Sequence, residues 1–134
     1  MYQVDAFASQ VFAGNPAAIV PLEKWLDDGL MQRIAMENNL AETAYFVPRP
    51  GGYHIRWFTP NTEIDLCGHA TLASAWVLFE QMGFDGNRIS FESKSGHLGV
   101  ERVGTQLSLD FPSRAPQKVE PCAGLLEALG GKPT

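Results

Sequence analysis

The chain has 134 residues, 45% of them hydrophobic, with a formal net charge of −5 and an isoelectric point near 5.1. This length suits one globular domain, and the acidic balance gives no electrostatic reason to expect nucleic acid or an anionic membrane as a partner. No run approaches the ~20 apolar residues of a membrane span, and the N-terminus lacks the pattern of a secretory signal. Two cysteines are too few for a disulfide framework, so the sequence predicts a cytoplasmic protein.

The first third of the chain is predicted to form two strands and one amphipathic helix. Residues 2–7 alternate between apolar and polar side chains, and residues 17–22 form an apolar strand after a turn at residues 14–16. From Asp27 onward, apolar residues recur at helical spacing. Asp27 is the expected N-cap of this helix, and the asparagines at residues 38–39 mark its expected end.

A hairpin and a short strand are predicted next. Residues 40–47 and residues 53–58 are both strand-like and are separated by a glycine-containing turn, which is typical of a hairpin. A further turn leads into a short strand at residues 64–66. Within the hairpin, His54 and Arg56 alternate with apolar residues and are predicted to lie on a solvated face.

Residues 69–82 have the length of a helix but are apolar almost all round, with their few polar residues crowded in the first turn. A helix without a polar face is buried on all sides. Three more strands are predicted at residues 88–92, 98–103 and 106–111. Together these elements predict an α+β fold, in which a curved, mostly antiparallel sheet wraps around one central buried helix and a second helix lies outside.

The composition changes after the last of these strands. Residues 112–121 contain three prolines and mixed charge, which is typical of a linker, and residues 125–129 begin another helix that two glycines end. We therefore predict one structural unit over residues 1–112. Residues 113–134 are predicted to be a linker and the start of a second half that the chain does not contain.

The first candidate site is the segment Cys67-Gly68-His69-Ala70-Thr71, where a strand runs into the buried helix. The first turn of a helix carries unpaired N–H donors and the positive end of the helix dipole, and both suit a substrate carboxylate. Gly68 would let a ligand approach the backbone closely. The alternative is a structural turn whose donors are capped by Thr71 or by water.

The second candidate is Glu42. Side chains alternate along a strand, so Glu42 shares a face with Leu40, Ala44 and Phe46 and is predicted to point toward the core. Burial disfavours the charged form of a carboxylate, which suits it to give and take protons near neutral pH. The alternatives are a buried glutamate tied to backbone donors, or an edge-strand glutamate turned toward water.

Cys67 is the third candidate. It falls on the same strand face as Glu63 and Asp65, and it could act as a thiol base because a helix terminus lowers the pKa of a thiol. The alternative is an inert buried cysteine. No metal site is predicted, because the other histidines and Cys122 lie at no ligand-like spacing from Cys67 and His69.

Four short motifs occur in order along the chain. They are VDAF at residues 4–7, FAGNPAA at 12–18, NLAETA at 39–44, and FTP at 58–60 leading to LCGHATLA at 66–73. In sequence and spacing they resemble the PhzF-like (phenazine-biosynthesis-like) isomerase family. The resemblance implies one half of a diaminopimelate epimerase-like fold, in which two similar halves each wrap a sheet around a central helix and enclose the active site between them.

The resemblance also implies roles for particular residues. The family's catalytic glutamate matches Glu42, and its substrate-pocket histidine matches His69. The substrate-binding set that follows is Asn15, Gly68, His69, Ala70 and Thr71. No cofactor is implied. The phenazine member of the family shifts a hydrogen within a dihydro-hydroxyanthranilate, and Cys67 stands where the related proline racemases and diaminopimelate epimerases keep a catalytic cysteine.

The sequence therefore predicts a cofactor-independent isomerase that moves a proton on a small carboxylated metabolite. Its catalytic candidates are Glu42, His69 and Cys67, and its active site is expected to be incomplete without the family's other half. Two alternatives stay open. The chain could be an inactive fragment that serves as a ligand-binding or dimerisation module, with a homodimer burying its cleft face, or it could be a racemase or epimerase that uses Cys67 as its base.

Overall fold

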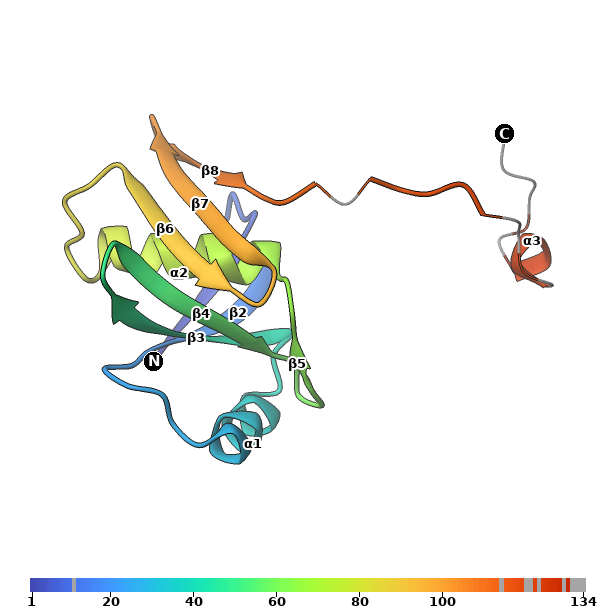
Figure 1. The fold of residues 1–134 in the computed structure, drawn as a ribbon, viewed down its shortest axis with the longest axis horizontal. Helices are drawn as coiled ribbons and strands as arrows, with labels where there is room; N and C mark the ends of the chain where they lie inside the picture. Colours follow the sequence, from blue (N-terminus) through green and yellow to red (C-terminus); the bar gives the residue numbers. More distant parts are fainter. Residues whose placement is uncertain (11, 114, 120–121, 123, 129, 131–134) are drawn as a thin grey trace.

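The computed structural model describes residues 1–10, 12–113, 115–119, 122, 124–128 and 130. A curled sheet winds around one helix, and a second helix lies outside the sheet (Figure 1). The helices are α1 (Asp28–Asn38), α2 (Gly68–Glu80) and α3 (Leu125–Ala128). The strands are β1 (Tyr2–Ala6), β2 (Asn15–Pro21), β3 (Glu42–Arg49), β4 (Gly52–Phe58), β5 (Glu63–Ile64), β6 (Arg88–Ser93), β7 (Gly96–Val103) and β8 (Gln106–Asp110).

The sheet follows the order β1-β2-β3-β4-β6-β7-β8, with β5 added beside β4. The β2–β3 and β4–β6 pairs are parallel, and the other neighbours are antiparallel, as the predicted mostly antiparallel sheet requires. The predicted hairpin is present as β3 and β4, with Arg49 paired to Gly52 at its turn. The two ends of the strand order, β1 and β8, are the edges of a half-barrel.

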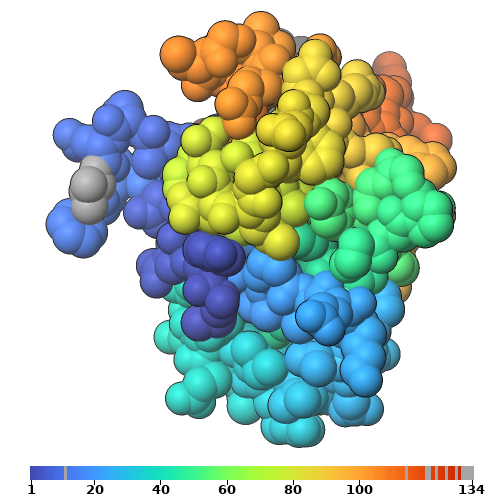
Figure 2. Space-filling model, turned by 90° about the vertical axis from the view of Figure 1, so that its left-hand side faces the viewer, coloured from blue at the N-terminus to red at the C-terminus, as the bar shows by residue number. Residues whose placement is uncertain are grey.

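The helix α2 fills the inside of this half-barrel. Most of its side chains are buried, and Ala73 and Leu78 are at most 1% exposed. The prediction that this helix is buried on all sides fails along one line, because Trp76 is 40% exposed and Leu72 is only partly buried. These two side chains form the floor of a groove of about 690 Å³ between the edges β1 and β8. Figure 2 shows the β1–β2 loop (blue, at left) standing away from the β7–β8 turn (orange, at top).

The helix α1 packs on the opposite side of the sheet. The Asp27 carboxylate accepts a hydrogen bond from the Leu30 N–H at 3.1 Å, and Asn39 ends the helix in the left-handed conformation with φ of 49°. Both predicted ends of this helix are therefore confirmed. The Tyr45 hydroxyl of β3 donates to the Met31 carbonyl at 2.8 Å, which fixes the helix against the sheet.

Some boundaries differ from the prediction. The strand β2 begins at Asn15 rather than after the turn, because Asn15 pairs with Ala6 of β1. The strand β5 holds only Glu63–Ile64. The helix predicted from Leu125 is present as α3, but its predicted end at Leu129 lies outside the described residues. Among the described residues, every helix is too short or too polar to cross a membrane.

The buried α2 gives a test of where the stability of this fold originates. Leu78 is fully buried, so Leu78→Ala should lower the free energy of unfolding by about 3 kcal/mol, from lost apolar burial and the cavity left behind. The control is Met82→Ala just beyond the helix, where the side chain is 49% exposed and the loss should be about 0.5 kcal/mol. Urea unfolding measures both, and equal losses would contradict this account of the core.

Candidate functional site

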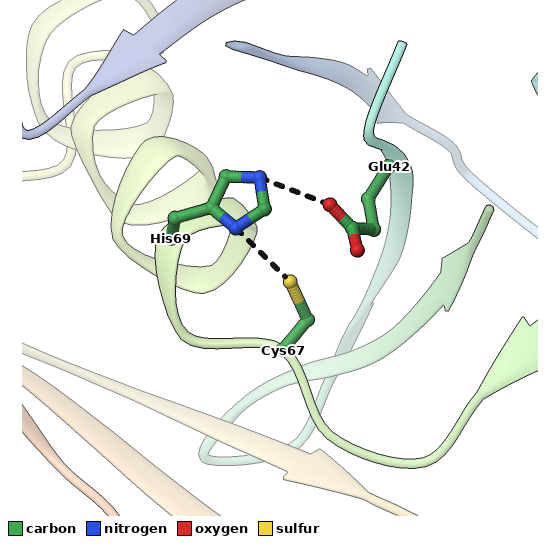
Figure 3. A group of neighbouring side chains, drawn as sticks. All are labelled: Glu42, Cys67 and His69. Atoms are coloured by element: carbon green, nitrogen blue, oxygen red, sulfur yellow. Dashed lines mark hydrogen bonds and ion pairs between the residues drawn. The ribbon is translucent and has the colours of Figure 1, made fainter. Parts of the chain in front are cut away.

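Three predicted residues meet where α2 begins. Glu42 comes from β3, Cys67 from the N-cap of α2, and His69 from its first turn. His69 lies between the other two, as Figure 3 shows. Its Nε2 is 3.1 Å from Glu42 Oε2, and its Nδ1 is 3.5 Å from Cys67 Sγ. The structure therefore joins two motifs that are more than twenty positions apart in the sequence.

The position of Glu42 follows from strand alternation. Ala44 and Phe46, on the same face of β3, pack in the cluster that surrounds α2, so the predicted orientation toward the core is confirmed. The Glu42 side chain is 16% exposed, and it stands at the first residue of the strand, where the sheet meets the start of α2. The carboxylate is thus held at the edge of the core rather than within it.

The two hydroxyl side chains in the first half of α2 both donate hydrogen bonds to backbone carbonyls of the preceding turn. The Thr71 hydroxyl donates to the Cys67 carbonyl at 2.6 Å, and the Ser74 hydroxyl donates to the Ala70 carbonyl at 2.7 Å. Thr71 therefore does not cap the N–H donors of the helix, which excludes the capping role considered for it. The N-cap side chain, Cys67, makes no capping hydrogen bond either. The N–H groups of His69 and Ala70 face the Cys67 sulfur, and no capping hydrogen bond occupies the N–H groups of this turn, so the turn can still bind an anion.

The facing atoms of Glu42 and His69 are unusual for buried polar groups. Glu42 Oε2 and His69 Nε2 are both inaccessible to solvent, and neither has a hydrogen-bond partner among the described residues. Their 3.1 Å contact is an ion-pair distance without the alignment of a hydrogen bond. Buried polar atoms are nearly always satisfied, and exceptions concentrate at functional sites. This pair is the strongest sign of a functional site in the described part of the chain.

The environment of Cys67 does not favour a thiolate. Burial raises the pKa of the Cys67 thiol to about 12, and the Glu42 carboxylate acts in the same direction. The backbone N–H groups of Ala70 and His69 lower this pKa, but burial outweighs them. The helix terminus therefore acts on this thiol in the expected direction, but the pKa of Cys67 is raised overall because burial has the larger effect. The prediction that Glu63, Asp65 and Cys67 share one strand face is wrong. Asp65 is exposed and lies beyond the end of β5.

Arg56 links β4 to β5 and to α1 near the segment that leads into the site, and the sequence did not indicate this role. Its side chain is only 15% exposed, so the predicted solvated position is wrong. Its Nε donates to Glu63 of β5 at 2.7 Å, and its Nη1 donates to Asp28 of α1 at 2.8 Å. The Arg56–Glu63 hydrogen bond holds the pKa of the Glu63 carboxyl below its usual value, and the Lys94 ammonium contributes to the same effect. The Arg56 hydrogen bonds anchor the segment that leads from β5 into Cys67, but no local pattern indicates contacts over such separations.

The other predicted substrate-binding residues are Asn15, Gly68 and Ala70, and each has its own structural setting. Ala17 pairs with Glu42 in register, so Asn15, two residues earlier, lies on the same side of the sheet as Glu42. Ala70 is fully buried and can offer a ligand only its backbone N–H. Gly68 has a packing reason to be glycine, because a Cβ there would lie 3.3 Å from the ring of Phe111.

Most of the chain matches one family of known proteins. Residues 4–123 match the family model described as phenazine biosynthesis-like protein. The chain is 56% identical over 133 residues to a protein of Pseudomonas aeruginosa named an uncharacterized isomerase, covering 97% of the chain and 50% of that protein. A crystal structure of a PhzF-family protein from Enterococcus faecalis superposes with a TM-score of 0.86 at 50% identity, covering 98% of this chain and 50% of that one.

A structure with lower sequence identity has the same fold. A predicted epimerase from Pseudomonas aeruginosa has a TM-score of 0.66 at 27% identity, over 79% of this chain and 39% of that one. The fold is therefore α+β and of the epimerase type, as predicted. The chain belongs to the phenazine biosynthesis-like (PhzC-PhzF) family, in which relatives carry isomerase names. It spans about half the length of the curated relatives it matches.

The two cysteines allow a direct test of the site's burial. Burial raises the pKa of the Cys67 thiol to about 12, so very little of it is ionised at pH 8, whereas Cys122 is exposed. We expect a disulfide reagent such as Ellman's reagent to modify one thiol rapidly at pH 8 and the other only after unfolding. Cys122→Ser should abolish the rapid phase and Cys67→Ser should keep it. Rapid labelling of the Cys122→Ser protein would show that Cys67 is ionised and accessible.

Proposed function

We propose that this chain carries the acid/base half of the active site of a cofactor-independent isomerase, one that moves a proton on a small carboxylated metabolite. The observation that supports it most is the Glu42–His69 pair, whose facing atoms are buried, 3.1 Å apart and without other hydrogen-bond partners. The family match and the isomerase names of relatives agree with this class of reaction.

The pair suits proton transfer in both directions. Glu42 as a carboxylate takes a proton from a substrate carbon next to an unsaturated or carbonyl-activated centre, and as a carboxylic acid it returns the proton at another carbon. His69 Nε2, within 3.1 Å, stabilises the charged form of Glu42 when its ring carries the proton. The proton taken up by Glu42 is returned to the substrate, so the step balances and consumes no co-reactant.

The start of α2 suits the anionic end of such a substrate. The backbone N–H groups of the segment from Gly68 to Thr71 belong to the first turn of a helix of 13 residues, where the dipole favours negative charge. A carboxylate bound there would sit beside His69 and fix the reacting carbon relative to Glu42. Such positioning supplies a large share of the rate in proton transfer.

A second half is part of this proposal. The relatives are about twice as long as the chain, and a site at the end of a half-barrel needs a cover that excludes water. Phe7 and Phe12 are 75% and 98% exposed, and the groove between β1 and β8 has Trp76 on its floor. These apolar surfaces favour contact with another polypeptide, which would be the family's second half or a second copy of this chain.

The alternative that uses Cys67 as the base has less support. Its thiol is 7% exposed, and its pKa of about 12 leaves little thiolate near neutral pH. A cytoplasmic location belongs to the proposal, because two cysteines are too few for the disulfide framework of a secreted domain.

The proposal predicts that proton exchange depends on Glu42. Incubation in heavy water with a panel of carboxylated metabolites, including a dihydro-hydroxyanthranilate and α-amino acids, followed by NMR, measures exchange at carbon. The chain is tested alone and mixed with the C-terminal half of a full-length relative. Exchange should appear in the mixture and fall by about 10²- to 10⁴-fold in Glu42→Gln, because the amide cannot take the proton.

Cys67→Ser is the matched control, since this residue touches the same histidine. Exchange that persists in Cys67→Ser and is lost in Glu42→Gln supports the glutamate mechanism. The reverse pattern would move the protein to the racemases. Ligand binding that survives in every variant while no sample exchanges would leave a binding module in place of an enzyme.

A homodimer of the chain is the second candidate for covering the site. If two copies bury the groove, sedimentation should show twice the monomer mass at high micromolar concentration, and Trp76→Gln on the groove floor should shift the protein toward monomer. Met36→Gln is the control, because this exposed residue belongs to α1 and not to the groove. A monomer at every concentration would eliminate the dimer.

A further inference from the structure

The three side chains at the start of α2 also have the chemistry of a metal site. Glu42, Cys67 and His69 each offer one ligand atom, and these atoms all lie within 4.8 Å of one another. Carboxylate, thiolate and imidazole are the three ligand types that proteins use for zinc. Sequence spacing did not indicate this site, because the third ligand is a glutamate from a different motif rather than another histidine or cysteine.

The separations are close to those of ligands on one ion. Zinc lies about 2.3 Å from sulfur and about 2.0 to 2.2 Å from nitrogen or oxygen, so two ligands of a tetrahedral ion are roughly 3.3 to 3.6 Å apart. The distance from Cys67 Sγ to His69 Nδ1 is 3.5 Å. One Glu42 oxygen lies within 4.8 Å of Cys67 Sγ and of a ring nitrogen of His69, so a rotation of the Glu42 side chain is needed to bring the oxygen within range of the ion.

The histidine can use only one ring nitrogen for a given ion. Nδ1, on the Cys67 side, is the one placed to bind, while Nε2 faces Glu42 (Figure 3). A metal on Nδ1 and a partner of Nε2 lie on opposite sides of the ring, so Glu42 has to turn away from Nε2 to bind the same ion as Cys67 and His69.

Charge and burial select the class of ion. Cys67 and His69 are at most 9% exposed, so a bound ion would sit in a largely dry site. One carboxylate and one thiolate neutralise a divalent cation there. Magnesium and calcium need six or more oxygen ligands, which this set does not provide, whereas zinc is stable with three protein ligands and one open position.

We propose that Glu42, Cys67 and His69 form a binding site for zinc or a similar thiophilic divalent cation, with a fourth position open to water or an anion. Binding releases the thiol proton, so affinity should rise with pH. The binding claim does not depend on the proposed isomerase function. If that function holds as well, a bound ion occupies the lone pairs that Glu42 and His69 need for proton transfer, and zinc would act as an inhibitor.

Cobalt titration of the intact chain tests the site, because Co²⁺ replaces zinc and gives visible bands and a near-ultraviolet thiolate-to-cobalt band. We expect one cobalt per chain, displaced by one equivalent of zinc. Cys67→Ser should lose the thiolate band, and Glu42→Gln should weaken zinc binding by at least about tenfold, measured by competition with a chromophoric chelator.

Cys122→Ser and His97→Gln are the controls, since both residues are exposed and outside the cluster. Each should leave the spectrum and the zinc affinity unchanged. Circular dichroism confirms that every variant is folded. A thiolate band that survives Cys67→Ser and disappears in Cys122→Ser would overturn the proposal, as would a parent chain that binds no cobalt at millimolar concentration and pH 8.

Discussion

Burial of α2 is the constraint on which the rest of this structure depends. A helix with almost no polar face cannot be covered by one flat layer, so the sheet must curl around it. The strand order from β1 to β8 and the cluster formed by Phe46, Trp57 and Phe91 achieve this cover. The cover stops short along one line, where Trp76 remains exposed between the edge strands.

The same constraint creates the site. Because α2 begins inside the half-barrel, its first-turn N–H groups and the His69 side chain are withdrawn from water together. The first residue of β3 lies beside them and brings the Glu42 carboxylate within 3.1 Å of the imidazole. A carboxylate, an imidazole and free helix donors in a dry setting interact far more strongly than they would at the surface.

Low polarity also bears on Cys67 as a candidate base. Burial opposes ionisation of the Cys67 thiol, and the neighbouring carboxylate adds to that effect. A metal ion would reverse this preference by supplying the positive charge that the site lacks. The proposed proton transfer through Glu42 and the proposed metal binding through the Cys67 thiolate would therefore be alternative uses of one cluster, and they would differ in whether Cys67 is ionised.

The sequence by itself determined the fold class, both ends of α1, the hairpin, the central helix and the family, because local periodicity, caps and four spaced motifs carry those signals. It also placed Glu42 on the inner face of its strand. The tertiary structure alone decided the 3.1 Å contact of Glu42 with His69, the anchoring of Arg56 on Glu63 and Asp28, and the state of Cys67. The physical reason is that distances between segments and the polarity of a site depend on which elements surround it, whereas periodicity and capping depend only on neighbours in the chain.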